Sequence, residues 1–136
     1  YRAIQAQISK WKSAGELFLL NLSFVQLLSE GVPLQEPGTQ DFVFSTGLFD
    51  YIRESRSQSL ILALYGLLAD GGMLTIGNAC APQKMFWSAE FLVDWTILYR
   101  TRDEVLRMAA LLPKDAEVDV VLEPGEAYYF LTIRKP

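Results

Sequence analysis

Residues 41–52 read DFVFSTGLFDYI, and residues 67–78 read LLADGGMLTIGN. Each stretch contains a short, continuous apolar run, at 41–44 and at 73–76, that is typical of a strand covered on both faces. Each run is followed by polar residues or glycine, which favour a turn at the end of the strand. The two runs therefore predict neighbouring buried strands of a parallel sheet.

The segment between these two runs predicts a helix. Apolar residues at helical spacing begin after Ser55, which has Gln58 as its capping-box partner. The buried face of this helix is expected to comprise Leu60, Ile61, Leu64, Leu67 and Leu68. Asp70-Gly71-Gly72 should end it, because glycine adopts the left-handed backbone at a helix end without a Cβ clash.

The rest of the chain continues the alternation of helices and strands. A Thr-x-x-Glu capping box at Thr101 and Glu104 predicts the start of a late helix. The other predicted elements are a helix over residues 1 to about 12, a strand over 16–20, a short helix from Ser23, a helix from Pro82, and strands at about 117–123 and 127–134. This order predicts an α/β fold of three layers, with a parallel sheet between helices and an antiparallel strand pair at the C-terminal edge.

Composition limits the classes of function. The 136 residues suit a single domain over 1–136, with 51% hydrophobic residues and a net charge of −4. No apolar run approaches the roughly 20 residues of a membrane-spanning helix, so no membrane span is expected. The longest basic cluster is Arg134-Lys135. A nucleic-acid partner is therefore not expected, because neutralisation of phosphates by basic side chains supplies most of the affinity of proteins for nucleic acids.

The chain contains no histidine and one cysteine, Cys80. It cannot by itself build a Ser-His-Asp or Cys-His relay, a histidine-ligated metal site, a zinc ribbon or an intrachain disulfide, and no metal is expected. The single thiol suits a reducing compartment, and no signal peptide precedes the first periodic segment. A cytoplasmic location is the resulting prediction.

Ligands of open parallel sheets bind beyond the carboxyl ends of the strands. The predicted strands end at Asn21-Leu22, at residues 45–49 and at Gly77-Asn78. Two interpretations remain open: these residues simply end the strands, or a nucleotide-like ligand lies across the strand ends. Neither G-x-G-x-x-G nor the P-loop spacing occurs in the chain, so such a ligand would lack its usual first loop here.

The stretches at 41–52 and 67–78 resemble the fourth and fifth strands, respectively, of class I S-adenosylmethionine-dependent methyltransferases. In that family a helix leads through an L-x-P-G-G-x-L turn into the fifth strand, and Asp70 stands here where the proline is common. The segments VDWTILYRT at 93–101 and YYFLTIRKP at 128–136 narrow the resemblance. They are similar to a bacterial subgroup that includes enzymes making 3-hydroxy fatty acid methyl esters, the extracellular-factor synthases.

The resemblance covers about residues 16–136 and implies the C-terminal portion of a larger enzyme. Family members begin with two strands that carry a glycine-rich motif and an acidic residue for the cofactor ribose, and neither has a match in this sequence. In the family sheet order, 3-2-1-4-5-7-6, both missing strands lie between the strand at 16–20, which would be the third, and the strand at 41–44. An N-terminally truncated Rossmann-like methyltransferase fold would expose sheet edges, through which homo-oligomers could form.

The resemblance also implies which residues bind S-adenosylmethionine. Asn21 and Leu22 would lie near the adenine. The methionine end of the cofactor would be lined by Ser45, Thr46, Gly47, Leu48 and Phe49. Asn21 could instead cap the helix that follows it, and Asp50 could cap or start the next helix.

The acceptor side is expected to comprise Tyr51, Asn78, Trp95, Tyr99 and Arg100. Trp95 and Tyr99 are also i, i+4 neighbours that could simply pack together. Arg100 could bind an acceptor carboxylate in bidentate geometry or form a structural ion pair.

A carboxylate is already ionised at neutral pH, so its methylation requires no general base. O-methylation of a small-molecule or fatty-acyl carboxylate is therefore compatible with a chain that lacks histidine and is the expected reaction, and other acceptors remain open. The alternative is a catalytically inactive, methyltransferase-like interaction module.

Overall fold

The computed structural model describes residues 20–21, 23–28, 38–80, 94 and 96–136. Several sequence predictions fall outside these residues: the opening helix, the strand at 16–20 apart from Leu20, the helix from Pro82, and the candidate ligand-binding residues Leu22 and Trp95. Among the described residues, Leu20 belongs to no helix or strand.

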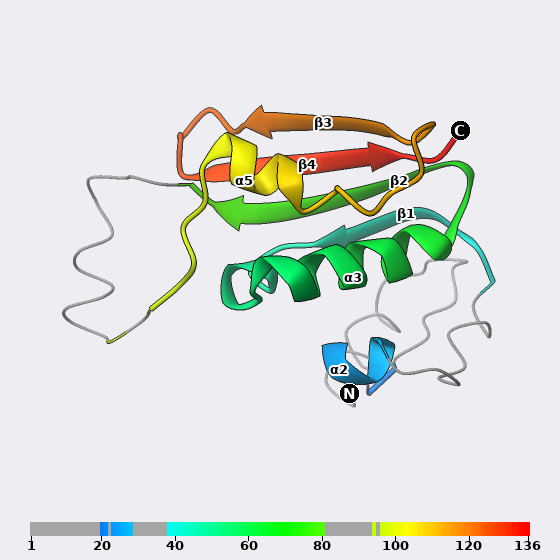
Figure 1. The fold of residues 1–136 in the computed structure, drawn as a ribbon, viewed down its shortest axis with the longest axis horizontal. Helices are drawn as coiled ribbons and strands as arrows, with labels where there is room; N and C mark the ends of the chain where they lie inside the picture. The colour runs from blue at the N-terminus through cyan, green and yellow to red at the C-terminus, as the bar shows by residue number, and fades with distance from the viewer. Residues whose placement is uncertain (1–19, 22, 29–37, 81–93, 95) are drawn as a thin grey trace, which may run out of the picture.

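A four-stranded sheet of order β1-β2-β4-β3 forms the body of the fold (Figure 1). Strand β1 (Gln40–Ser45) runs parallel to β2 (Leu68–Ala79). Strand β4 (Tyr128–Arg134) is antiparallel to both β2 and β3 (Glu117–Leu122). The parallel pair and the antiparallel C-terminal pair are confirmed. The strand order matches the 4-5-7-6 half of the sheet expected from the resemblance.

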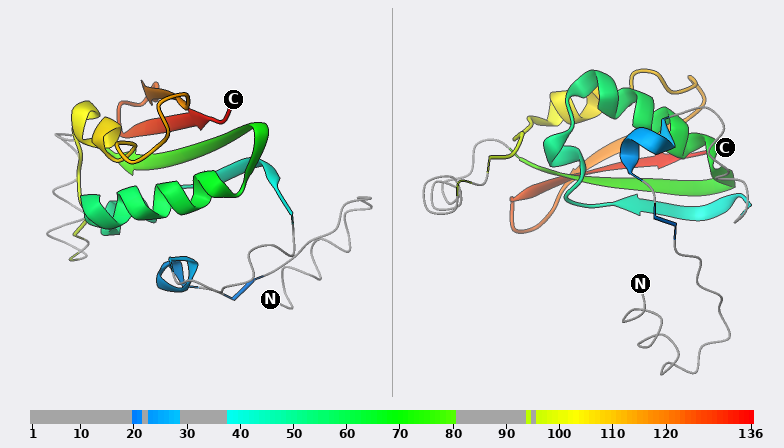
Figure 2. Two further views of the ribbon diagram at one scale, coloured as in Figure 1. Left: turned by 45° about the vertical axis from the view of Figure 1, so that its right-hand side comes forward. Right: turned by 90° about the horizontal axis from the view of Figure 1, so that it is seen from below.

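The described helices α2 (Phe24–Leu27), α3 (Glu54–Gly66) and α5 (Arg102–Arg107) lie on one face of the sheet (Figure 2). A short 3-10 helix, η1 (Phe49–Tyr51), connects β1 to α3. Within the described residues the opposite face carries no helix, so this part of the chain has two layers where the sequence predicted three. None of the described helices is long and apolar enough to cross a membrane.

The hydrophobic core lies between the sheet and the helices α3 and α5. Its fully buried side chains alternate along each strand, as expected where only one face of a strand packs inward. They include Leu74 and Ile76 of β2, Leu131 and Ile133 of β4, Leu60 and Ile61 of α3, Val105 of α5, and Met108 directly after α5.

The predicted capping box of α5 is present. The Thr101 hydroxyl accepts a hydrogen bond from the Glu104 backbone N–H at 3.3 Å, and the Glu104 carboxylate accepts one from the Thr101 N–H at 2.7 Å. Both hydrogen bonds satisfy backbone donors that have no partner inside the helix. The helix itself ends at Arg107, earlier than the apolar spacing predicted, and turns continue the chain toward Pro113.

The predicted start of α3, at about Ser55, is confirmed to within one residue, but its predicted capping box and its predicted C-terminal end were wrong. Its N-cap is Arg53, which makes no side-chain cap hydrogen bond, so Ser55 and Gln58 form no capping box there. The Gln58 amide instead donates to the Arg107 carbonyl at 2.9 Å. The helix ends at Gly66, and the glycine pair that was expected to end it lies inside β2.

The glycine pair has a different structural role. The register between β1 and β2 shifts there, from Gln40 opposite Leu68 to Phe42 opposite Met73, so residues 69–72 form an irregularity in β2. Gly71 has a φ of 78°. A Cβ at Gly72 would lie 2.8 Å from the Ala69 carbonyl oxygen and 2.9 Å from that of Gln40. Close backbone approach, and not a helix end, requires glycine here.

Replacing Gly72 with alanine should destabilise the protein by about 1–3 kcal/mol, because both atoms that meet the new Cβ belong to the backbone and cannot rotate away. Gly66→Ala is the matched control, since a Cβ at Gly66 would meet nothing within 4 Å. This control should be neutral or stabilising by up to about 1 kcal/mol. Urea unfolding measures the stability of both variants. Equal denaturation midpoints for Gly72→Ala and Gly66→Ala would contradict the close backbone approach at Gly72.

Candidate functional site

The carboxyl ends of β1 and β2 lie side by side (Figure 1), and the segment before α5 returns to the same place. The Leu98 N–H donates to the Asp50 carbonyl at 2.7 Å, and the Arg100 N–H donates to the Ala79 carbonyl at 3.0 Å. The backbones of Cys80 and Arg100 also pair in an isolated parallel β-bridge. The end of β2, the loop after β1 and the segment 96–101 are therefore fixed to one another by backbone hydrogen bonds.

The side chain of Arg100 joins the same segments from inside the protein. The residue is 6% exposed. Its Nη1 donates to the Phe49 carbonyl at 2.8 Å and to Oδ1 of Asn78, and its Nη2 donates to the Ile52 carbonyl. Burial lowers the pKa of Arg100, although the negative charge of Asp50 opposes this shift. The contacts found for Arg100 are structural, although they are hydrogen bonds to carbonyls and to an amide and not the ion pair that the sequence offered.

Asn78 and Phe49 also point into the protein. Asn78 is fully buried, and its amide Nδ2 donates to the Leu98 carbonyl at 3.0 Å while its Oδ1 accepts from Arg100. Phe49 is fully buried in the hydrophobic core. The side chains of Asn78, Phe49 and Arg100, which the sequence assigned to ligand sites, are thus all buried in this structure, and their ligand-binding roles stay predictions. They satisfy backbone groups or fill the core at the end of the sheet.

Asp50 is a buried acid that the sequence treated as a helix cap or helix start. Its Oδ1 accepts a hydrogen bond from the Ala79 N–H at 2.8 Å, and the residue is 2% exposed. Burial raises the pKa of the Asp50 carboxyl, while the hydrogen bond from Ala79 and the charge of Arg100 oppose this rise. Sequence spacing carries no signal for this contact, because Asp50 and Ala79 are far apart in the chain.

The turn between β1 and η1 presents exposed backbone. Thr46 and Gly47 are exposed, and Ser45 and Leu48 are partly buried. Gly47 has a φ of 80°, and a Cβ built on it would meet nothing within 4 Å. The backbone of this turn is thus open to a ligand at the carboxyl end of β1, where ligands of parallel sheets bind.

Asn21 lies elsewhere, in the short segment before α2, and is exposed. The cap of that helix is Ser23, whose hydroxyl accepts from the Gln26 N–H at 3.3 Å. Asn21 is therefore not the helix cap that the sequence offered as its alternative role.

A hollow of about 330 Å³ adjoins the loop after η1. It is lined by Tyr51, Ile52, Arg53, Ser55 and Arg56. Tyr51 is 51% exposed, so its ring is accessible from solvent. Tyr99, the other described aromatic candidate, is partly buried.

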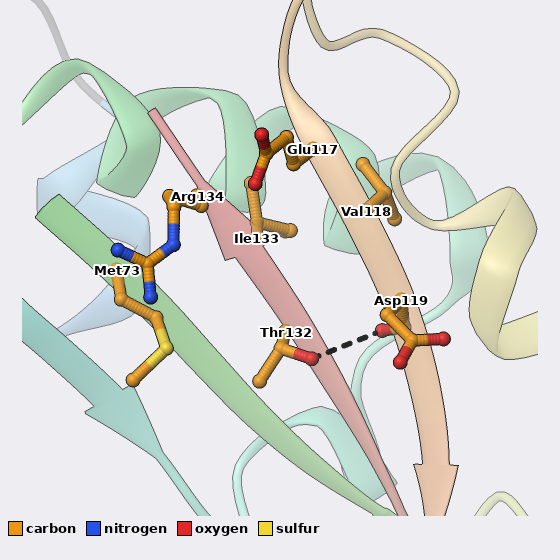
Figure 3. Close-up of a pocket in the computed structure, with 7 residues that line it drawn as sticks. All are labelled: Met73, Glu117, Val118, Asp119, Thr132, Ile133 and Arg134. Atoms are coloured by element: carbon orange, nitrogen blue, oxygen red, sulfur yellow. Dashed lines mark hydrogen bonds between the residues drawn. The ribbon is translucent and has the colours of Figure 1, made fainter. Parts of the chain in front are cut away.

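A second hollow, of about 260 Å³, lies on the helix-free face of the sheet (Figure 3). Met73 at the start of the regular part of β2 and Arg134 at the end of β4 border it, and the Thr132 hydroxyl donates to the Asp119 carbonyl at 3.3 Å. Its lining residue in β2, Met73, lies in the middle of that strand, and the lining includes neither Asn78 nor the turn after β1. It is therefore not part of the site at the carboxyl ends of β1 and β2.

No protein-family model and no curated protein sequence matches the chain. Solved structures do match. The S-adenosylmethionine-dependent methyltransferase SibL, in its apo form, is 13% identical with a TM-score of 0.67, and the match covers 99% of this chain and 40% of SibL. An O-methyltransferase family protein from Burkholderia thailandensis is 19% identical with a TM-score of 0.57, covering 98% and 39% of the two chains. Human N-acetylserotonin methyltransferase, solved with S-adenosylmethionine, is 14% identical with a TM-score of 0.59, covering 95% and 37%.

The chain therefore has the fold of one part of S-adenosylmethionine-dependent methyltransferases and spans 37–40% of the length of these solved proteins. At 13–19% identity the similarity concerns the fold alone.

Replacing Arg100 with lysine should destabilise the protein by about 1–3 kcal/mol, because one ammonium cannot replace the guanidinium at two carbonyls and the Asn78 amide. Arg102→Lys is the matched control, since the Arg102 side chain is 54% exposed and lies 3.9 Å from Asp119. Its effect should stay within about 0.5 kcal/mol. Chemical denaturation measures both variants, and a neutral Arg100→Lys would refute the structural role of Arg100.

The raised pKa of Asp50 predicts a pH dependence of stability. Below 3.8, the ordinary pKa of an aspartate side chain, the carboxyl is protonated in both the folded and the unfolded chain. As the pH rises above that value, the unfolded chain loses the proton first and is favoured. The free energy of unfolding of the wild-type protein should therefore fall relative to that of Asp50→Asn between the ordinary and the raised pKa. Urea unfolding at a series of pH values from about 3.5 upward tests this. If the wild type instead gained stability relative to Asp50→Asn as the pH rises, the pKa of Asp50 in the folded protein would be lowered and not raised.

Proposed function

We propose that this chain is the C-terminal portion of an S-adenosylmethionine-dependent O-methyltransferase. The observation that carries the proposal is the fold match to S-adenosylmethionine-dependent methyltransferases over 95–99% of the chain. Residues 1–136 would form part of one domain with an upstream segment that supplies the glycine-rich motif and the ribose-binding acid.

The residues present fit one end of the cofactor. The turn from Ser45 to Leu48 leaves the carboxyl end of β1, and Gly47 offers bare backbone with open space above it. Polar backbone beside open space suits the amino-acid end of a nucleoside cofactor. Ser45, Thr46, Gly47 and Leu48 are the residues proposed to hold it, and Asn21 and Leu22 remain proposed for the adenine.

When bound, S-adenosylmethionine supplies an electrophilic methyl group. A carboxylate acceptor carries its own lone pair at neutral pH, so no side chain of this chain has to remove a proton. This agrees with the residues of the site: the chain has no histidine, and the Asp50 carboxylate is buried against the Ala79 N–H and faces away from solvent. The role left to the chain is to position the acceptor and exclude water.

The proposed acceptor class is a small-molecule or fatty-acyl carboxylate. The resemblance of residues 93–101 and 128–136 to enzymes that make 3-hydroxy fatty acid methyl esters supports this choice. Tyr51 is the described acceptor-side candidate that is most accessible. A cytoplasmic location and a bacterial source remain predictions from the sequence.

The alternative is an inactive interaction module that pairs through its sheet. Phe42 and Phe44 on the helix-free face are exposed, and their rings stack with centroids 5.8 Å apart. An upstream part of the same domain would cover such a face equally well, and the three solved neighbours named above are methyltransferases. A stable, cofactor-free oligomer in light scattering would favour the module.

In the intact protein, Gly47→Val should weaken S-adenosylhomocysteine binding by about tenfold or more, because the new side chain fills the space above the turn. Gly38→Val is the matched control, since Gly38 also has a positive φ, 71°, and open space around its Cβ position, but precedes β1 at the opposite end of that strand. Isothermal titration calorimetry measures both. The proposal fails if the intact wild-type protein shows no binding heat, or if the two variants bind equally well.

A further inference from the structure

Gly77 lies near the carboxyl end of β2, directly after Ile76, the last residue of β2 that pairs with β1. The residue is buried. A Cβ built on it would lie 3.2 Å from Cε1 of Phe130 and 3.3 Å from Cγ2 of Thr46. An aromatic ring and a methyl group therefore both cover the backbone of this glycine. Glycine inside a strand often marks such a close approach.

The two side chains over Gly77 come from opposite neighbours of β2. Phe130 is the partner of Gly77 in β4, and it lies on the helix-free face because the next residue, Leu131, is fully buried in the core. Thr46 directly follows β1 and belongs to the turn that is proposed to hold the cofactor. The packing of Thr46 and Phe130 over Gly77, called the Gly77 contact below, thus joins this turn to β2 and β4.

The turn is also fixed on either side of Gly47. Before it, Ser45 pairs with Ile76 in the ladder of β1 and β2. After it, the side chain of Leu48 packs against the hydrophobic core. The Gly77 contact adds an attachment for the residue directly before Gly47. Gly47 itself has a φ of 80° and open space around its Cβ position, so its backbone stays accessible while its neighbours are held.

We infer that Gly77 and Phe130 are positioning residues for the cofactor: the Gly77 contact sets the place of the turn at Gly47 and thereby the affinity for S-adenosylmethionine. This inference rests on the proposed function, in which that turn holds the amino-acid end of the cofactor. A loop that is already in its binding position saves the free energy of ordering it when the ligand binds. Phe130 acts through Thr46 and has no contact of its own with the cofactor in this arrangement.

The Gly77 contact complements the buried guanidinium of Arg100. Arg100 donates to the Phe49 and Ile52 carbonyls and so holds the loop after β1 from inside the protein. The Gly77 contact holds the beginning of the same loop on the helix-free face. It also gives Thr46 a role through its methyl group, because Cγ2 is the Thr46 atom that lies over Gly77.

Two substitutions disturb the Gly77 contact in opposite ways. Gly77→Ala adds a methyl group that fits only if a neighbour moves by a few tenths of an ångström. Thr46 is exposed and Phe130 is partly buried between two strands, so we expect the turn to move first. Phe130→Leu removes the edge of the ring and leaves the methyl group of Thr46 without its neighbour. Either change should therefore leave the turn less well placed for a ligand.

The test compares Gly77→Ala and Phe130→Leu with the wild type in the intact protein, and calorimetry measures the affinity for S-adenosylhomocysteine. Phe42→Leu is the matched control, since Phe42 is an aromatic residue of the helix-free face that is 52% exposed and lies in the first half of β1. Circular dichroism establishes that each variant is folded at the temperature of the measurement, so a merely structural loss of stability would leave the affinity unchanged. NMR measures the hydrogen exchange of the Gly47 amide without ligand.

Gly77→Ala and Phe130→Leu should each weaken S-adenosylhomocysteine binding about three- to tenfold, whereas Phe42→Leu should not. Phe130→Leu should also speed the exchange of the Gly47 amide. A further pair separates the methyl group of Thr46 from its hydroxyl. Thr46→Ser removes the methyl group and should weaken binding more than Thr46→Val, which removes the hydroxyl.

The inference is overturned if Gly77→Ala and Phe130→Leu bind like the wild type, if Phe42→Leu weakens binding equally, or if Thr46→Val binds more weakly than Thr46→Ser. If Phe130→Leu does not fold, Gly77→Ala decides. Wild-type affinity in these variants leaves the proposed function intact. If the intact wild type binds no S-adenosylhomocysteine, the proposed function fails, and the exchange of the Gly47 amide still decides whether the Gly77 contact fixes the turn.

Discussion

The buried guanidinium of Arg100 is the interaction on which the functional end of the sheet depends. It joins the loop after β1, through Phe49 and Ile52, to Asn78 at the end of β2. A cation inside a protein is costly unless its donors are satisfied and a charge lies nearby. Here backbone carbonyls, an amide oxygen and the charge of Asp50 meet that requirement. The loop therefore has one position relative to the sheet.

This constraint separates the inner side of the loop from its outer side. Asp50, Asn78 and Arg100 hold the inner side together, and none of them is accessible to a ligand. The outer side carries the open turn at Gly47 and the exposed residues Tyr51, Arg53 and Arg56. The proposed methyltransferase function would use such a division, because cofactor and acceptor must be held in a fixed relation while the groups that fix them stay out of the reaction.

Much of the sheet was predictable from the sequence, because the predicted strands at 41–44, 117–123 and 127–134 match β1, β3 and β4 to within one residue at each end. The glycine pair was misread, since a helix end and a strand irregularity both require glycine. The roles of Arg100 and Asp50 were not predictable, because their partners are distant in sequence.

A crystal structure of the intact protein with S-adenosylhomocysteine tests the central claim most directly. The account predicts that the amino-acid end of the ligand lies against the backbone of residues 45–48. A ligand bound elsewhere, or a turn at Gly47 filled by the protein's own side chains, would contradict it.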